Sequence, residues 1–339
     1  MHAGRQYSLL HTLFWTSKYI LIFAIWSTIV VLLYSTLEIK WIGIPWLPIA
    51  LVGTAIAFYL GFKNNSAYDR LWEARKIWGG IVNSSRTLGV MARDFVTNEY
   101  ANERLSQTEL QKIHRRLIYR HIAWLYALTF QLREPKPWEH NNKKSAQNRM
   151  SFDTDPKPER YDYLKQFIST EDFAYISSKT NRAVQLLSLQ SKDLKELKSK
   201  GLIDNFRHME MKGLIEKLYA LQGKCERIKN YPFPRQYASV NVFFVWLFSF
   251  LLPFAMVHEF SQTGGCFIWL TVPLCVVVSW VFHTMEVIGD FSENPFEGLF
   301  NDVPMTSLSR TIEIDLREML DETDLPVPIK PVTKFKILL

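Results

Sequence analysis

The titratable and sulfur-bearing residues of the 339-residue chain form no familiar catalytic or metal-binding pattern. There is no GxxxxGKS/T phosphate loop, no GxGxxG turn and no HExxH helix. His114 and His121 are seven residues apart on one helical face without a third ligand at hand, which indicates packing or solvation. The three cysteines lack CxxC spacing. We therefore predict no enzyme, no catalytic residue, no cofactor and no metal site.

Three residues of an apolar run offer a different kind of chemistry. Thr54, Phe58 and Phe62 are spaced i, i+4 and i+8, so they share one face of a helix. Repeated around an axis, they would form collars of threonine and phenylalanine, and such a constriction can gate by dewetting. Ring edges turned to the axis would suit anions, and ring faces would suit cations. The spacing alone favours an ordinary stripe that packs on lipid or helices, because apolar stripes of this period are routine.

Four uncharged runs are long enough to cross a membrane as helices, which takes about 20 apolar residues. These runs of 19, 22, 22 and 23 residues lie between Lys18 and Glu38, Lys40 and Lys63, Arg235 and His258, and Glu259 and His283. Four runs of this length disfavour buried helices of a soluble protein, and the first is too long for a usual signal peptide. We predict an all-α integral membrane protein. Pro253 and Pro273 should kink or break their helices.

Charge in the loops predicts the orientation. The links within each pair of crossings carry little positive charge, whereas the segment after the second crossing is rich in Lys and Arg. Both termini and the middle segment should therefore be cytoplasmic, with the crossings in the cell (inner) membrane. The net charge of +7 fits such loops, and we predict no nucleic-acid partner.

The organisation follows from this pattern. We predict an N-terminal segment with two crossings at 1–63, a helical cytoplasmic domain at 64–235, two further crossings at 236–283, and a cytoplasmic C-terminal helix and tail at 284–339. Within the cytoplasmic parts, apolar spacing predicts helices at 108–133, 171–199, 203–229 and 306–320, with a Pro-rich loop at 134–160.

Three motifs, taken together, resemble the bestrophin family and more closely its bacterial branch. They are FYLGFKNNSAYDRLWEARKIWG at 58–79, CERIKNYPFPRQY at 225–237 and ENPFEGLFNDVPMTSLSRTIEIDL at 293–316. The resemblance covers nearly the whole chain in order. It implies a homopentameric channel in which five copies of the second helix line the pore and cytoplasmic helices extend it as a vestibule. Cyclic symmetry would close the ring.

The resemblance also implies roles for particular residues. Thr54, Phe58 and Phe62 fall on the hydrophobic neck of the family, which reverses the preference for a packing stripe. A second, cytoplasmic constriction falls at Phe206, with Ile203 or Met209 in its place if the register differs. A buried phenylalanine remains an equal explanation of Phe206.

Polar residues follow the neck directly. The amides of Asn64 and Asn65 can substitute for hydration water, and Lys63 would favour anions. These residues can equally cap and hydrate the membrane edge. Arg70, Glu73, Arg75, Glu286 and Asp290 should form ion pairs where the second and fourth helices leave the membrane.

One motif departs from the family pattern. Animal bestrophins carry a dense acidic run that helps hold calcium, whereas Glu297 and Asp302 are separated here by Gly298, Leu299 and Phe300 and an asparagine. Calcium takes about six to eight oxygens. We predict no calcium site in this stretch.

We predict a pentameric channel that passes small monovalent ions passively through the lipid bilayer, with anions such as chloride slightly favoured. The nearest alternative is a sodium channel of the same architecture. A second alternative is a non-conducting membrane scaffold that recruits a cytoplasmic partner, and a membrane-bound enzyme ranks third. The spacing of residues does not count subunits.

Overall fold

The computed structural model describes residues 1, 3–4, 9–140, 159–331 and 337–338. Within these residues the regular elements are helices, apart from one bridge residue at Ile337, which confirms the all-α fold class. The chain divides into two compact units. The apolar unit comprises Gly4–Arg70 and Pro232–Glu293; the polar unit comprises Met1–Ala3, Leu71–Tyr231 and Asn294–Leu339.

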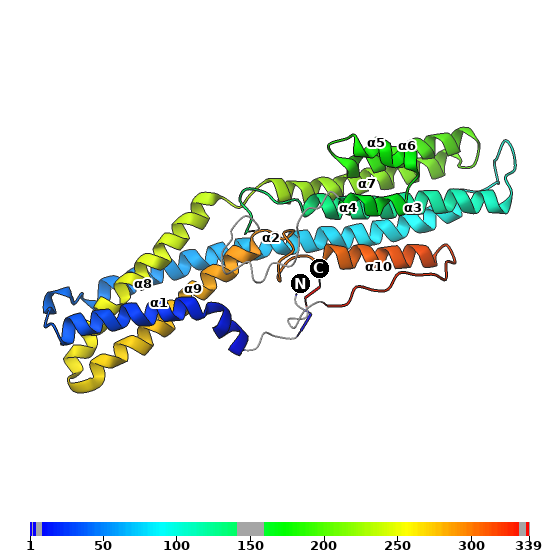
Figure 1. Ribbon diagram of the computed structural model, residues 1–339. Coiled ribbons are helices and arrows are strands. Elements are labelled where there is room, and N and C mark those ends of the chain that lie inside the picture. The colour runs from blue at the N-terminus through cyan, green and yellow to red at the C-terminus, as the bar shows by residue number, and fades with distance from the viewer. Residues whose placement is uncertain (2, 5–8, 141–158, 332–336, 339) are drawn as a thin grey trace. The chain divides into compact units, whose positions relative to one another are not determined.

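The apolar unit holds the helices that are long and apolar enough to cross a membrane. They are α1 (Leu9–Ser35), the first half of α2 (Trp46–Phe95), α8 (Arg235–Thr263) and α9 (Thr271–Ser292), with 3-10 turns η1 (Lys40–Ile42) and η5 (Gly265–Leu270). By length and composition the described residues contain four candidate spans, which confirms the number predicted. Figure 1 shows α1, α8 and α9 beside α2.

The two prolines predicted to disturb their helices behave differently. Pro273 is the third residue of α9, and the first turn of a helix has no intrahelical acceptor for its N–H groups, so the missing N–H costs little. The preceding helix α8 has already ended before Gly264 and η5. Pro253 lies inside α8, which nevertheless continues to Thr263. Neighbouring carbonyls of α8 accept hydrogen bonds from other segments: Phe250 O from Trp26 Nε1 at 3.0 Å and Phe254 O from Ile44 N at 3.2 Å. Neither helix is broken at its proline, and a kink at Pro253 stays a prediction.

The polar unit is built from short and long helices around α3. Its elements after α2 are α3 (Gln107–Leu132), α4 (Glu159–Asp162), η4 (Tyr163–Gln166), α5 (Thr170–Ser177), α6 (Arg182–Ser199), α7 (Asn205–Asn230) and α10 (Met305–Glu318). The helix predicted at 171–199 is divided into α5 and α6. The physical reason is Asn181, whose side chain accepts from Val184 N and caps a new helix. Part of the predicted loop, 141–158, lies outside the described residues.

Helix α3 begins at a capping box in which the Ser106 side chain and the Glu109 side chain satisfy each other's backbone N–H groups. Every residue from Leu117 to Leu128 is buried, although the sequence indicated only an amphipathic helix. The burial arises because α6, α7 and α10 all pack on α3. Polar side chains are buried there as well: His121 Nε2 lies 2.8 Å from Ser85 Oγ, and burial lowers the pKa of His121 to about 3.

Candidate functional site

The face of α2 that carries Thr54, Phe58 and Phe62 points away from the rest of the described chain. The side chains of Phe58 and Phe62 are 70% and 64% exposed, and their ring centroids are 5.7 Å apart. Thr54 is exposed as well, and its hydroxyl donates to Ala50 O at 2.9 Å, one turn earlier. The three residues are therefore not part of the packing within the described chain. Their face is available to lipid or to another copy.

The opposite face of α2 explains this orientation. Ile56 and Leu60 are buried against an apolar cluster that includes Phe248 of α8 and Cys275 of α9. Gly53 allows α2 and α8 to approach each other closely, because a Cβ at this position would lie 2.8 Å from the ring of Phe248. Burial of each such aliphatic side chain contributes roughly 1.5–3 kcal/mol. The packing of this face holds the phenylalanine face outward.

Lys63 does not lie on the exposed face, contrary to what its position after Phe62 suggested. Its side chain is buried, with a relative exposure of 2%, and its ammonium donates to Glu286 Oε1 of α9 at 2.8 Å. The angular step of about 100° per residue carries position 63 from the outer face to the inner one. The Lys63 charge is therefore neutralised within the subunit, where it joins α2 to α9.

Asn64 and Asn65 are separated in the same way. Asn64 Nδ2 donates to Met285 O at 3.0 Å, and a Cβ on Gly289 would lie only 2.0 Å from Asn64 Oδ1. Asn64 thus interlocks with α9 at a position where glycine is required. Asn65 is exposed and stands three residues after Phe62, so it alone of the polar trio continues the outer face.

Phe206 is the most exposed of the three predicted phenylalanines. It lies in the first turn of α7 with 87% of its surface exposed, and Met209 beside it is 69% exposed. The cap explains the position: Asp204 Oδ1 accepts from Phe206 N at 2.7 Å and from Arg207 N at 3.0 Å. Ile203 is 1% exposed and belongs to the core, so of the two alternatives only Met209 shares the surface.

Charged groups surround Phe206. Arg207 pairs with Glu99 at 2.8 Å and with Asp204 at 3.2 Å. Partial burial and the nearby ammonium groups of Lys198 and Lys212 lower the pKa of His208. A neutral histidine therefore stands next to the exposed phenylalanine at neutral pH.

Comparison with known proteins now places the chain. A model of the family described as "Bacterial/Fungal Bestrophin protein" matches residues 11–318. The chain belongs to this bestrophin family. It is 26% identical over 290 residues to YneE of Escherichia coli K12, named a voltage-dependent anion channel-forming protein; the match covers 86% of this chain and 82% of YneE.

Further similarities agree with this assignment. RSc3414 of Ralstonia nicotianae, which carries the same description, is 27% identical over 278 residues, covering 82% of this chain and 78% of the relative. A crystal structure of a bacterial bestrophin homolog from Klebsiella pneumoniae superposes with a TM-score of 0.73 at 25% identity, covering 89% of this chain and 97% of that one. Together with the apolar helices, these relatives identify a multi-pass membrane protein.

In this bestrophin the stretch that departs from the animal pattern forms part of a buried polar network. Glu297 is fully buried and its carboxylate lies 3.2 Å from His140 Nδ1. Asp302 Oδ2 accepts from Gly298 N and Leu299 N, and lies 3.7 Å from Arg133 Nη1. Burial raises the pKa of Asp302 to about 7, while Arg133 favours its ionised form. Both carboxylates thus have protein partners, and the described residues contain no group of three metal-ligating side chains.

Sequence reasoning missed how the predicted ion-pair residues combine. Glu286 pairs with Lys63, which the sequence placed among the polar residues beside the neck, and Glu73 accepts from Arg227 Nη2 of α7 at 2.5 Å. The available signal was Glu286, an acidic residue at the end of an apolar run, which needs a buried partner. Nothing in the spacing identified Lys63 as that partner.

Proposed function

We propose that this bestrophin forms a homopentameric channel in which five copies of α2 direct Thr54, Phe58 and Phe62 toward a central axis. Small monovalent ions pass through it down their gradient, with chloride favoured. The observation that carries the proposal is the outward phenylalanine face of α2. An aromatic face on a helix whose other side is fully packed suits a ring of identical subunits.

The relatives supply independent support. The curated relatives are named voltage-dependent anion channel-forming proteins, and family membership points to a channel and not to an enzyme. Within the apolar unit the Lys63 ammonium is neutralised by Glu286, so this charge does not by itself offer a path for ions. An aqueous path then requires several copies.

The site residues have distinct parts in this proposal. Thr54, Phe58 and Phe62 make the neck, and Asn65 offers an amide to ions that leave it. Phe206 makes a second, cytoplasmic constriction. Lys63 and Asn64 do not line the neck; their hydrogen bonds to α9 fix the orientation of α2.

The proposed topology keeps both termini in the cytoplasm and the crossings in the inner membrane. It assigns 1–63 and 236–283 to the crossings with the N-terminal segment, 64–235 to the cytoplasmic domain and 284–339 to the C-terminal helix and tail. The support is the excess of Lys and Arg after the second crossing.

A sodium channel of the same architecture is the second candidate, and one observation favours it. The positive charge expected beside the neck is absent from the outer face because Lys63 pairs with Glu286. The exposed residue one turn beyond Asn65 is Asp69, an acid. Anion preference then depends on ring edges at the neck and on the basic surroundings of Phe206.

The test is the reversal potential of the purified protein in a planar bilayer with unequal sodium chloride on the two sides. A value near the chloride equilibrium potential supports the proposal, and one near the sodium potential selects the cation channel. The F58A/F62A double variant is the companion, because a wider neck should raise the current. Absence of current from both proteins would reject a channel and favour a membrane scaffold.

A further inference from the structure

Helix α3 carries a basic surface in the polar unit that the proposed channel does not use. Lys112, Arg115 and Arg116 line a shallow hollow of about 330 Å³ together with Tyr119. The lining is completed by Gln166, the last residue of η4, and by Phe167 and Ile168, which follow it. Among these described lining residues none is acidic. We call this surface the α3 basic hollow.

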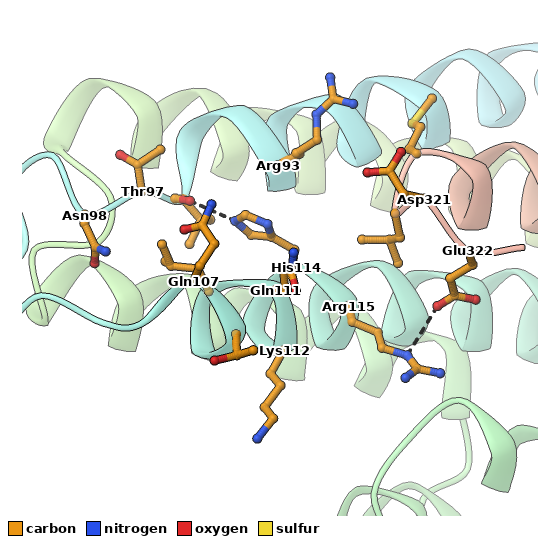
Figure 2. Close-up of a pocket in the computed structure, with 15 residues that line it drawn as sticks. Arg93, Thr97, Asn98, Gln107, Gln111, Lys112, His114, Arg115, Asp321 and Glu322 are labelled. Atoms are coloured by element: carbon orange, nitrogen blue, oxygen red, sulfur yellow. Dashed lines mark hydrogen bonds and ion pairs between the residues drawn. The ribbon is translucent and has the colours of Figure 1, made fainter.

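Neighbouring hollows differ in charge. The larger one, of about 910 Å³, shares Lys112 and Arg115 with the α3 basic hollow and is also lined by Asp321 and Glu322 (Figure 2). His114 lies in its wall, with Nε2 2.8 Å from Val96 O. Another, of about 230 Å³, places Asp172 and Asp193 among its walls. Carboxylates in both would repel an anion. The α3 basic hollow is the one of the three whose described lining carries cations alone.

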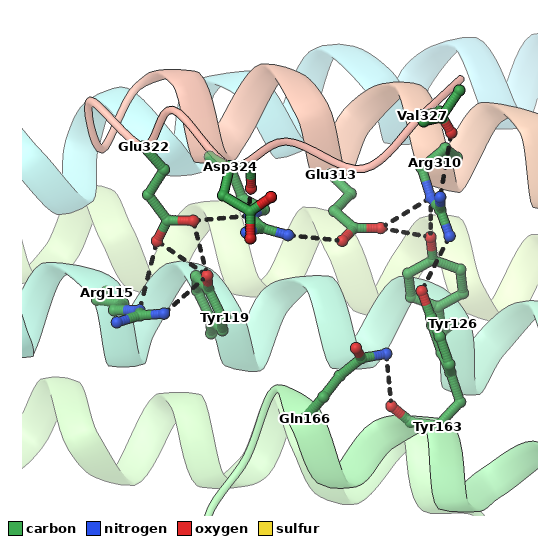
Figure 3. Close-up of polar contacts among 11 residues, drawn as sticks. Arg115, Tyr119, Tyr126, Tyr163, Gln166, Arg310, Glu313, Glu322, Asp324 and Val327 are labelled. Atoms are coloured by element: carbon green, nitrogen blue, oxygen red, sulfur yellow. Dashed lines mark hydrogen bonds and ion pairs between the residues drawn. The ribbon is translucent and has the colours of Figure 1, made fainter. Parts of the chain in front are cut away.

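The arginines of the hollow are held in place by polar partners. Arg116 Nε donates to Asp193 at 3.0 Å, and Arg115 lies 3.4 Å from Glu322 through Nε while its Nη2 donates to the Tyr119 hydroxyl at 3.1 Å. Figure 3 shows that Arg115 and Tyr119 both contact the carboxylate of Glu322. A guanidinium has five donors, so these contacts leave others for a ligand. Anchoring also lowers the entropy lost on binding.

The remaining walls supply an apolar surface. Phe167 is buried and its ring lies 5.9 Å from that of Tyr119 in an edge-to-face arrangement. Lys112 is exposed and extends from the same side of α3 as Arg115 (Figure 2). A ligand that fits both walls has an anionic group for the three cations and an apolar or aromatic part for Phe167 and Ile168.

We propose that the α3 basic hollow binds a small organic phosphate, a phosphate monoester attached to an apolar or aromatic group. A phosphate monoester carries about −1.5 to −2 charges at pH 7 and three acceptor oxygens, which match three cations better than a single carboxylate does. This site is independent of ion conduction, so its test does not depend on the channel.

The experiment is isothermal titration calorimetry of the purified full-length protein in detergent with phenyl phosphate as the probe. We expect saturable binding of one molecule per chain. The variant K112Q should bind about tenfold more weakly, the loss of one charge-assisted contact. K112E should abolish binding and K112R should retain it. Lys112 is exposed, so equal melting temperatures will show that these variants fold.

The matched control is K192Q, which removes an exposed lysine of α6 (72% exposed) that lies outside the hollow and should leave binding unchanged. Four results would overturn the proposal: no saturable binding at millimolar probe, equal affinity for inorganic phosphate, equal weakening in K192Q, or interaction only with vesicles of anionic lipid. The second would show that the apolar wall takes no part. The last would assign the basic surface to a membrane.

Discussion

The exposed phenylalanines of α2 and of α7 differ in what lies around them. Behind Phe58 and Phe62 lies a buried ion pair, Lys63 with Glu286. Around Phe206, Arg207 forms surface ion pairs with Glu99 and Asp204, and the pKa of the neighbouring His208 is lowered. Exposed phenylalanines in one protein can therefore depend on different interactions. Buried packing fixes the position of Phe58 and Phe62, whereas solvent-accessible charged groups surround Phe206.

The largest effect should come from opening the buried pair. We expect Glu286→Ala to lower the free energy of unfolding by about 3–5 kcal/mol, because it leaves the Lys63 ammonium buried without its partner. Denaturant titration of the detergent-solubilised protein measures this loss. The double variant K63M/E286L should recover most of it. A loss below 1 kcal/mol in Glu286→Ala would mean that Lys63 reaches water, and the contrast with Phe206 would disappear.

A smaller loss is expected from Gly289→Ala, which brings a methyl group against Asn64 Oδ1. The flexible end of Asn64 can move, so we expect a cost of about 1–2 kcal/mol from overpacking. The variant N64A/G289A should be more stable than the sum of the two single changes indicates, as the same denaturant titrations would show. If the losses in the free energy of unfolding of the two single variants simply added, Asn64 and Gly289 would not be energetically coupled. The close contact between α2 and α9 at these residues would then contribute little.

Truncation of the exposed rings tests the proposed function directly. F58A/F62A and F206A should each change the free energy of unfolding by about 0.5 kcal/mol or less, since exposed side chains contribute little. Under the proposed function, F58A/F62A should raise single-channel conductance severalfold by removing the dewetting collar. F206A should alter ion selectivity more than conductance. The control is Tyr175→Ala, which truncates an exposed aromatic of α5 (42% exposed) and should leave conductance and selectivity unchanged.

The smallest effect is the pH dependence at His208. Because its folded pKa lies below the unfolded value of about 6.5, the unfolded chain binds more protons and stability declines as pH falls below about 6.5. H208Q should flatten this part of the curve, measured by denaturant titration between pH 7.5 and 5. If H208Q left the pH dependence of stability unaltered, His208 would not be the titrating group that distinguishes the surroundings of Phe206.

Much of the architecture was predictable from the sequence. The four apolar runs and the helical periods depend on local composition, so the crossings and most helices of the polar unit were found. The split of 171–199 at Asn181 and the continuity of α8 through Pro253 were not, because each depends on competing contacts. The capping side chain of Asn181 and the donors from Trp26 and Ile44 are visible only in the fold.

The candidate site divides along the same line. Spacing alone placed Thr54, Phe58 and Phe62 on one face of a helix, since 3.6 residues per turn is a property of the backbone. Only the tertiary structure decided that this face is outward, that Lys63 turns inward to Glu286, and that Phe206 is exposed while Ile203 is buried. Sequence patterns define faces and lengths because these are local, whereas the choice between packing and exposure depends on residues hundreds of positions away.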